Sequence, residues 1–382
     1  MKKTHKDIQQ NILLTLIKPL VYIWMWLDAS RKVHLGKGVN LNRKEPYIML
    51  ANHTFMFDVV HVPLRFRIVP FIIASQTLFT KQPAKFLVSQ VAHVIPKAKG
   101  KSDFKAIKNI YGVVKRGYPV LIFPEGNTTF YGETGYIEKA TMKLIKKLGL
   151  DVITCNVKGG YLSKPRWATG KRRNHKIELF YNKTISKELI KEMSVDEVSN
   201  VIHKALNHND YEYQREKMIP HPGKQLAEGI ENVVYICPHC EAVNSIVSDH
   251  NRIVCTECKK EGYVDKYGFI NGFKYDNLID WNNFQRNFTD KLRKSIITTE
   301  GFLNYMSMET EAQIPVGKIT MTYENGEIAI TGALKIVIPV KDMQNSNITL
   351  RRDFGFIYKN KHYLINLDKY GASFLRIVQE KY

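Results

Sequence analysis

Short apolar runs alternate with amphipathic stretches along the first half of the chain. Residues 47–51, 69–75, 118–123 and 150–157 are mostly apolar, and each run predicts a buried strand. Residues 102–117 and 137–149 instead carry apolar positions at helical spacing. Strands that alternate with helices predict an α/β domain, in which side chains at the ends of strands carry the chemistry.

The pattern changes toward the C-terminus. Residues 194–206 predict a helix that begins with a capping box, Ser194 and Glu197. Residues 318–332 alternate apolar and polar positions about Asn325-Gly326, a pair typical of a hairpin turn. Residues 355–367 predict a second hairpin and residues 371–382 a terminal helix, so the chain is expected to end in a small β-rich domain.

The N-terminus is strongly apolar between residues 12 and 27, with lysines before it and no cleavage site after it. Lys18 and Pro19 interrupt this run, which is shorter than the about 20 residues of a spanning helix. Trp24 and Trp26 suit a membrane interface. We therefore expect uncleaved amphipathic helices at residues 1–30, with Pro19 opening a second, kinked segment, and a buried core helix is the alternative. One polar stripe follows helical phase: Thr4, Asp7, Asn11, Thr15, Lys18 and Tyr22.

Charge narrows the class of partner. Lysine and arginine total 57 against 36 acidic residues, a formal net charge of +21, which predicts an anionic partner. Nucleic acid, an anionic lipid surface and a phosphorylated substrate all satisfy this charge. The basic residues are spread along the chain, and the cysteine-rich segment 237–258 is not strongly basic, which argues against nucleic acid.

The segment "HTFMFD" offers a pair of residues for proton transfer. His53 follows the strand predicted at residues 47–51, and Asp58 comes five positions later, where a helix is expected to begin. A turn between them brings the side chains together, so that the carboxylate orients the imidazole and the other ring nitrogen accepts a proton from a hydroxyl. The alternative is a helix N-cap at Asp58 and a hydrogen-bonded turn residue at His53.

Together with "FPEG" at residues 123–126, this segment resembles the glycerophospholipid acyltransferase family, which includes lysophosphatidate (1-acylglycerol-3-phosphate) acyltransferases. The family's second block corresponds to "HVIPKAKGKSD", and the resemblance covers about residues 10–210. It implies an α/β domain with a mixed sheet flanked by helices. It also implies that His53 is the general base, that Asp58 is its partner, and that Glu125 and Gly126 belong to a turn that binds the acceptor.

Two departures from the family concern the acceptor. The family usually continues Phe-Pro-Glu-Gly-Thr-Arg, with the arginine at the acceptor phosphate, whereas this chain has Asn127 and then Thr128. Lysines near the second block are candidate replacements for that arginine, or they form a solvated basic loop. We expect substrate contacts from Asn127 and Thr128 and from the lysines Lys97, Lys99 and Lys101.

The resemblance implies an O-acyltransferase of phospholipid biosynthesis at a membrane surface. The expected acyl donor is a thioester of coenzyme A or acyl carrier protein, and the expected acceptor is a lysophospholipid, 1-acylglycerol-3-phosphate first. A different, non-phosphorylated membrane alcohol is the alternative acceptor, and a zinc-ribbon protein that binds nucleic acid or a protein partner is the alternative of another class. We expect a monotopic or peripheral protein on the cytoplasmic face of the cell membrane.

Four of the five cysteines form two C-x2-C pairs. The pairs are Cys237 with Cys240 and Cys255 with Cys258, a spacing typical of a four-thiolate Zn²⁺ site. Such a closed shell leaves no open position, so the zinc is expected to be structural, with disulfides as the alternative. The expected division of the chain is therefore membrane-associating helices at 1–30, the acyltransferase domain at 31–210, a connector at 211–231, a zinc ribbon at 232–265 and a β-rich domain at 266–382.

Overall fold

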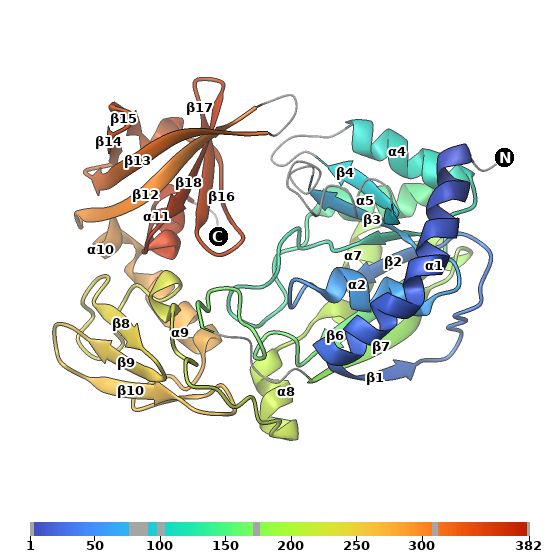
Figure 1. The fold of residues 1–382 in the computed structure, drawn as a ribbon, viewed down its shortest axis with the longest axis horizontal. Coiled ribbons are helices and arrows are strands. Elements are labelled where there is room, and N and C mark those ends of the chain that lie inside the picture. Colours follow the sequence, from blue (N-terminus) through green and yellow to red (C-terminus); the bar gives the residue numbers. More distant parts are fainter. Residues whose placement is uncertain (1–3, 76–90, 98–103, 171–175, 308–311, 380–382) are drawn as a thin grey trace. The chain divides into compact units, whose positions relative to one another are not determined.

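The chain folds into two compact units, seen in a computed structural model that describes residues 4–75, 91–97, 104–170, 176–307 and 312–379 (Figure 1). Unit 1 comprises residues 1–129, 133–161 and 175–213, and unit 2 comprises residues 130–132, 162–174 and 214–382. The predicted five-part division stays a prediction. Residues 211–231, predicted as a connector, contain most of helix α8 (Asp210–Lys217) and the buried Leu226, Ala227 and Ile230.

Unit 1 is built on a mixed seven-stranded sheet in the order β1-β7-β6-β2-β5-β3-β4. Among the ladders between described residues of this sheet, only the β6–β7 pair is antiparallel. The carboxyl ends of β6, β2, β5, β3 and β4 therefore meet at one edge. The strands are β1 (Ser30–Leu35), β2 (Ile48–Ala51), β3 (Phe71–Ser75), β4 (Val94–Lys97), β5 (Val120–Ile122), β6 (Val152–Lys158) and β7 (Lys176–Ile185).

Both faces of this sheet are buried, which explains why its central strands are continuous apolar runs in the sequence. Ile48 and Leu50 of β2 pack in one core cluster, whereas Met49 and Ala51 pack in another on the opposite face. The flanking helices in unit 1 are α1 (His5–Asp28), α2 (Asp58–His61), α4 (Phe104–Lys115), α5 (Lys139–Leu148), α6 (Leu189–Glu192) and α7 (Val195–Leu206). The predicted capping box of α7 is confirmed, because Ser194 accepts from the Glu197 N–H and Glu197 accepts from the Ser194 N–H.

Helix α1 has its polar stripe toward the protein and its apolar side chains toward the outside. The inward contacts are Asp7 with the Arg116 guanidinium, Asn11 with the Tyr118 hydroxyl, Lys18 with the Phe66 carbonyl and Tyr22 with the Leu64 carbonyl. Several apolar residues of the helix are exposed by 48% to 70%: Ile8, Ile12, Leu16, Leu20, Ile23 and Leu27. The alternative of a buried core helix is therefore wrong.

Pro19 does not open a separate second helix as expected, because a single helix runs from His5 to Asp28. Contacts hold it on both sides of the proline, with Lys18 bonded to the Phe66 carbonyl and Tyr22 to the Leu64 carbonyl. At 24 residues the helix is long and apolar enough to cross a membrane by length and composition alone, and 11% of its most apolar window is buried.

Unit 2 contains two antiparallel sheets. The first holds the cysteines and has the order β11-β10-β9-β8, formed by β8 (Ile246–Asp249), β9 (Arg252–Cys255), β10 (Glu261–Val264) and β11 (Ile270–Asn271). Helices α9 (Leu278–Gln285) and α10 (Thr289–Arg293) follow it. The second sheet has the order β15-β14-β13-β12-β18-β17-β16. Its strands are β12 (Ile297–Met306), β13 (Gln313–Glu324), β14 (Glu327–Gly332), β15 (Ile336–Pro339), β16 (Gln344–Thr349), β17 (Asp353–Tyr358) and β18 (Lys361–Leu367).

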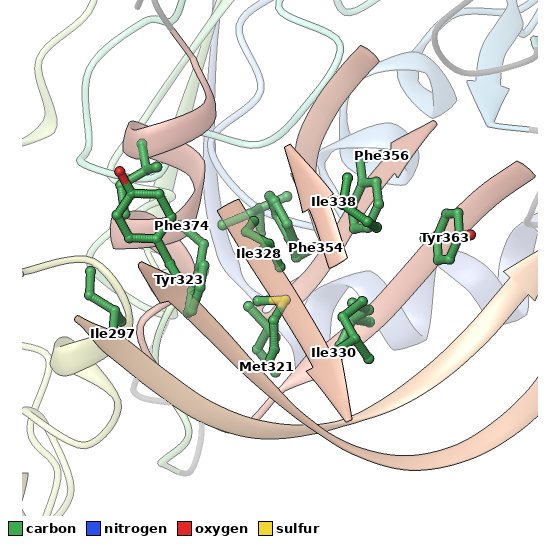
Figure 2. Close-up of a cluster of buried hydrophobic side chains, with 14 of the residues drawn as sticks. Ile297, Met321, Tyr323, Ile328, Ile330, Ile338, Phe354, Phe356, Tyr363 and Phe374 are labelled. Carbon is green, nitrogen blue, oxygen red and sulfur yellow. The ribbon is translucent and has the colours of Figure 1, made fainter. Parts of the chain in front are cut away.

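The β-rich C-terminal region predicted from the sequence is confirmed, including both hairpins and the terminal helix α11 (Gly371–Val378). Asn325 and Gly326 both have positive φ, 47° and 82°, as the tight turn between β13 and β14 requires. Figure 2 shows the core of this region, where Met321, Ile328 and Phe354 of three strands pack together with Phe374 of α11. This core is separate from the two that cover the sheet of unit 1.

Candidate active site and metal site

His53 and Asp58 lie next to each other at the carboxyl end of β2. The Nδ1 atom of His53 is 2.9 Å from Oδ2 of Asp58, across a turn that leads into the short helix α2. The turn explains the five-residue spacing, since the two side chains belong to different elements. The predicted strand, turn and helix are therefore present, although the helix that begins at Asp58 has only four residues before a 3₁₀ turn at Pro63–Arg65.

Asp58 is fully buried, and the turn supplies donors for one of its oxygens. Oδ2 accepts from the backbone N–H of Thr54 at 2.9 Å and of Phe55 at 3.3 Å, besides the His53 ring. The cap position of α2 is Phe57, and no side chain caps the helix, so the alternative of an N-cap at Asp58 is wrong. The carboxylate instead ties the turn together and holds the imidazole.

Asp58 contacts one ring nitrogen of His53, and the other, Nε2, can accept a proton. Asp58 is an acceptor, so its contact with Nδ1 favours the tautomer that carries its proton there and leaves a lone pair on Nε2. Nε2 has no hydrogen-bond partner among the described residues, and the side chain is 16% exposed. The Phe123 ring packs against the imidazole with its centroid at 4.5 Å. A hydroxyl placed at Nε2 would meet a base whose orientation is already set.

Glu125, in the turn after β5, reaches the same strand end. Its Oε1 accepts from the backbone N–H of His53 at 2.8 Å, and its Oε2 accepts from the N–H of Gly135 at 2.7 Å. Burial raises the pKa of this carboxyl to about 7, while the N–H groups of Gly135 and His53 act in the opposite direction. Gly126 has a φ of 72°, where a side chain would strain the backbone.

The structure describes three of the other five predicted substrate contacts. Asn127 and Thr128 are partly buried residues in the turn after Gly126, next to Thr129, whose N–H donates to the His53 carbonyl at 2.8 Å. Lys97 is exposed at the end of β4, and β4 is the third strand from β2 in the sheet. At about 4.8 Å per strand, the two strands are roughly 14 Å apart. Lys99 and Lys101 lie outside the described residues.

Sequence reasoning missed two residues that support the turn. The side chain of Asn52 donates to the Val157 carbonyl at 2.9 Å and accepts from the Val157 N–H at 2.6 Å, which joins β2 to β6. Gly160 lies so close to the turn that a Cβ there would be 2.2 Å from the Thr54 hydroxyl oxygen. The Gly159-Gly160 pair after β6 was the available signal, because glycine in such a place often marks a close approach of backbone.

The four cysteines converge in unit 2. Their Sγ atoms all lie within 4.8 Å of one another, with Cys237 and Cys258 3.9 Å apart and Cys240 and Cys255 3.7 Å apart. None is in a disulfide. Four sulfurs in a tetrahedron with Zn–S bonds of about 2.3 Å are about 3.8 Å apart, so the donor set fits Zn²⁺. Burial raises the pKa of the Cys237 thiol, while the backbone N–H groups of Cys240 and His239 act in the opposite direction.

Comparisons with known proteins match the part of the chain that contains β2. Residues 32–158 match the family model described as Acyltransferase. This part of the chain is therefore similar to acyltransferase domains. It is 26% identical over 144 residues to the 1-acyl-sn-glycerol-3-phosphate acyltransferase of Borreliella burgdorferi, a match that covers 36% of this chain and 55% of the relative. The chain thus spans about half the length of that relative.

Among solved structures, the chain is similar to the 1-acyl-sn-glycerophosphate acyltransferase PlsC from Thermotoga maritima, with 17% identity and a TM-score of 0.43. That likeness covers 57% of this chain and 85% of the other. The part that the family model matches contains His53, Asp58 and Glu125. The four-cysteine cluster and the β-rich region lie beyond the part that the family model matches.

Proposed function

We propose that the chain transfers a fatty acyl group from an acyl thioester to the free hydroxyl of a lysophospholipid, with 1-acylglycerol-3-phosphate as the acceptor. The observation that carries this proposal is the contact between His53 Nδ1 and Asp58 Oδ2, which leaves Nε2 accessible within an acyltransferase domain. The named relative acts on the same acceptor.

The proposed reaction needs one base and no enzyme nucleophile. The acceptor hydroxyl oxygen attacks the thioester carbonyl while its proton passes to His53 Nε2. Asp58 stabilises the imidazolium that forms. When the C–S bond breaks, the leaving thiolate takes that proton from Nε2, so an ester and a free thiol are the products and the histidine is neutral again.

Substitution of His53 tests the proposal directly. His53→Ala is expected to lower acyl transfer to 1-acylglycerol-3-phosphate by about 10²- to 10⁴-fold, the usual range for a general base. The matched control is His203→Ala, because His203 is exposed on α7 and its side chain makes no hydrogen bond in the described structure. Equal turnover in the two variants would end the proposal.

A non-phosphorylated membrane alcohol is the second candidate acceptor. Thr128 occupies the position where the family usually has an arginine, and Lys97 lies three strands from β2. A competition assay between 1-acylglycerol-3-phosphate and a monoacylglycerol would separate the candidates. Preferential acylation of the monoacylglycerol would favour the second.

Association with a membrane is part of the proposal, because α1 presents its apolar side chains outward. A helix that satisfies its polar stripe inside the protein and exposes a row of isoleucine and leucine is covered most simply by lipid. The formal net charge of +21 on the whole chain favours an anionic surface. We propose that the chain lies on the cytoplasmic face of the cell membrane.

A structural Zn²⁺ is also proposed. Cys237, Cys240, Cys255 and Cys258 would hold it as thiolates and so join the segment before β8 to the end of β9. A complete four-sulfur shell supplies stability and no catalysis.

A further inference from the structure

Both oxygens of the Glu125 carboxylate accept hydrogen bonds from backbone N–H groups of the protein itself. One oxygen accepts from the His53 N–H at 2.8 Å and the other from the Gly135 N–H at 2.7 Å. The two donors belong to segments that lie more than 80 residues apart in the chain, so the carboxylate bridges them. When the carboxyl is ionised, these bonds are charge-assisted and belong to the stronger hydrogen bonds in proteins.

The turn that carries Glu125 holds both peptide groups of His53. Besides the bond from the His53 N–H to Glu125, the Thr129 N–H donates to the His53 carbonyl at 2.8 Å. Backbone orientation decides which way a side chain points. The direction of the His53 ring therefore depends on residues 125–129 as well as on Asp58.

The far end of the bridge is itself fixed. Next to Gly135, the Thr134 N–H donates to the His208 carbonyl at 3.0 Å, and the Thr134 hydroxyl donates to the Leu206 carbonyl at 2.8 Å. These bonds attach the segment to the end of α7. A Cβ on Gly135 would be 3.1 Å from Oε2 of Glu125, so alanine at this position would crowd the carboxylate that joins the two segments.

We propose that Glu125 is a positioning residue, which holds the His53 backbone so that Nε2 faces the acceptor, and that it does not bind the acceptor itself. This inference rests on the proposed function of His53. It replaces the substrate contact implied for Glu125 by the family resemblance.

Glutamine at position 125 separates the two roles. An amide has one acceptor oxygen and places an NH₂ group against the second N–H, so Glu125→Gln breaks half of the bridge. A positioning role predicts a kcat about 100-fold lower with little change in the KM for the acceptor, because a displacement of about 1 Å at a catalytic group costs that much. An acceptor contact predicts a higher KM with kcat preserved.

The experiment combines these kinetics with hydrogen–deuterium exchange of the peptide that contains His53, measured on the full chain by mass spectrometry. Glu125→Gln is expected to speed exchange of the His53 amide about tenfold, as loss of one hydrogen bond predicts. Gly135→Ala disturbs the same bridge from its other end and is expected to act in the same direction. Glu138→Gln is the control, because Glu138 is exposed and its side chain caps nothing.

A raised KM with unchanged kcat, or unchanged exchange at His53 in both bridge variants, would overturn the inference. The exchange measurement does not depend on turnover. If the His53→Ala variant kept its activity, the proposed function would fail, while protection of the His53 amide would still decide whether Glu125 holds it.

Discussion

The Nε2 atom of His61 lies 2.9 Å from Oδ2 of Asp28, and neither side chain is more than 2% exposed. Asp28 is the last residue of α1, and His61 is the last residue of α2, the helix that Asp58 begins. The Trp24 ring of α1 also meets the Phe57 ring edge-on, with centroids 5.0 Å apart. The apolar N-terminal helix is therefore attached directly to the turn of the candidate active site.

Removal of one partner of this buried pair is expected to destabilise the protein. Asp28→Ala should lower the free energy of unfolding by about 3 kcal/mol, because it leaves the His61 imidazole buried without its acceptor. Denaturant unfolding measures the loss. Asp196→Ala is the control, since its pair with Lys139 is solvent-exposed on both sides and should contribute nothing measurable. Equal stability of the two variants would contradict the expected result.

The raised pKa of Glu125 predicts a pH dependence of stability. Its value of about 7 in the folded protein, against the ordinary 4.5, means that the folded state binds more protons than the unfolded state between these values. The contribution of Glu125 to stability therefore falls as pH rises from 4.5 to 7, by roughly 3 kcal/mol over the full range. His53 and Asp58 are the ionisable side chains that interact electrostatically with this carboxyl.

Unfolding of the wild type and Glu125→Gln at pH 5, 6, 7 and 8 isolates this group. The stability of the wild type relative to the variant should decrease as pH rises. A difference that stays constant over this range would mean that Glu125 titrates near its ordinary pKa.

Gly160→Ala is expected to reduce activity through the turn that it touches. The new Cβ would meet Thr54 and Phe55, at 2.2 Å from the Thr54 hydroxyl oxygen, so the turn between His53 and Asp58 must shift. A fall in kcat of about 10- to 100-fold is expected. Gly112→Ala in the middle of α4 is the control, because its nearest neighbour would be 3.5 Å away and alanine favours a helix. Full activity of Gly160→Ala would show that the turn tolerates the shift.

Loss of zinc is expected to unfold the smaller sheet of unit 2. Metal analysis of the purified protein should find a single zinc ion per chain, and Cys255→Ser should lose it, because β9 ends at that cysteine. Increased hydrogen exchange in β8–β10 reports the loss of structure, with unit 1 as the internal control. A metal-free protein with full protection in β8–β10 would exclude a structural metal.

Charges placed on the outer face of α1 are expected to abolish binding to lipid. Leu16 and Leu20 are 69% and 67% exposed, so Leu16→Glu with Leu20→Glu leaves the inward contacts intact while opposing contact with an apolar phase. Sedimentation with phosphatidylglycerol vesicles measures binding. The control is Lys204→Glu, because Lys204 is exposed on α7 and the substitution changes the charge away from α1. Thr15→Glu would not serve, since the Thr15 hydroxyl donates to the Asn11 carbonyl within α1. Unchanged sedimentation of the double variant would reject α1 as the lipid-binding face.

The sequence allowed much of this fold to be predicted because its signals are local. Strands β2 and β5 are apolar runs since both sheet faces are covered, and the hairpin at Asn325-Gly326 follows from residues that adopt positive φ easily. The cysteine spacing likewise lies within one short segment. The pairing of β1 with β7 was missed, because it joins Ser30 to Lys176 across most of unit 1.

In the candidate site too, local features could be predicted from the sequence and contacts between distant segments could not. The spacing of His53 and Asp58 could be interpreted from the strand and turn around them. Glu125 was found as part of a motif, but the direction of its carboxylate depends on Gly135 and on the fold of the whole edge. The polar stripe of α1 was visible in the sequence, yet only the structure shows that its residues bond to Arg116 and Tyr118.

The inward polar stripe of α1 has a practical consequence for handling the protein. Deletion of the helix is a common route to a soluble fragment of a membrane-associated enzyme, but here it would leave Arg116 without its carboxylate partner and His61 without Asp28. Such a fragment would expose a surface that the helix now covers. Substitution of the outward leucines and isoleucines by polar residues would preserve those bonds, and it is the better starting point for a detergent-free preparation.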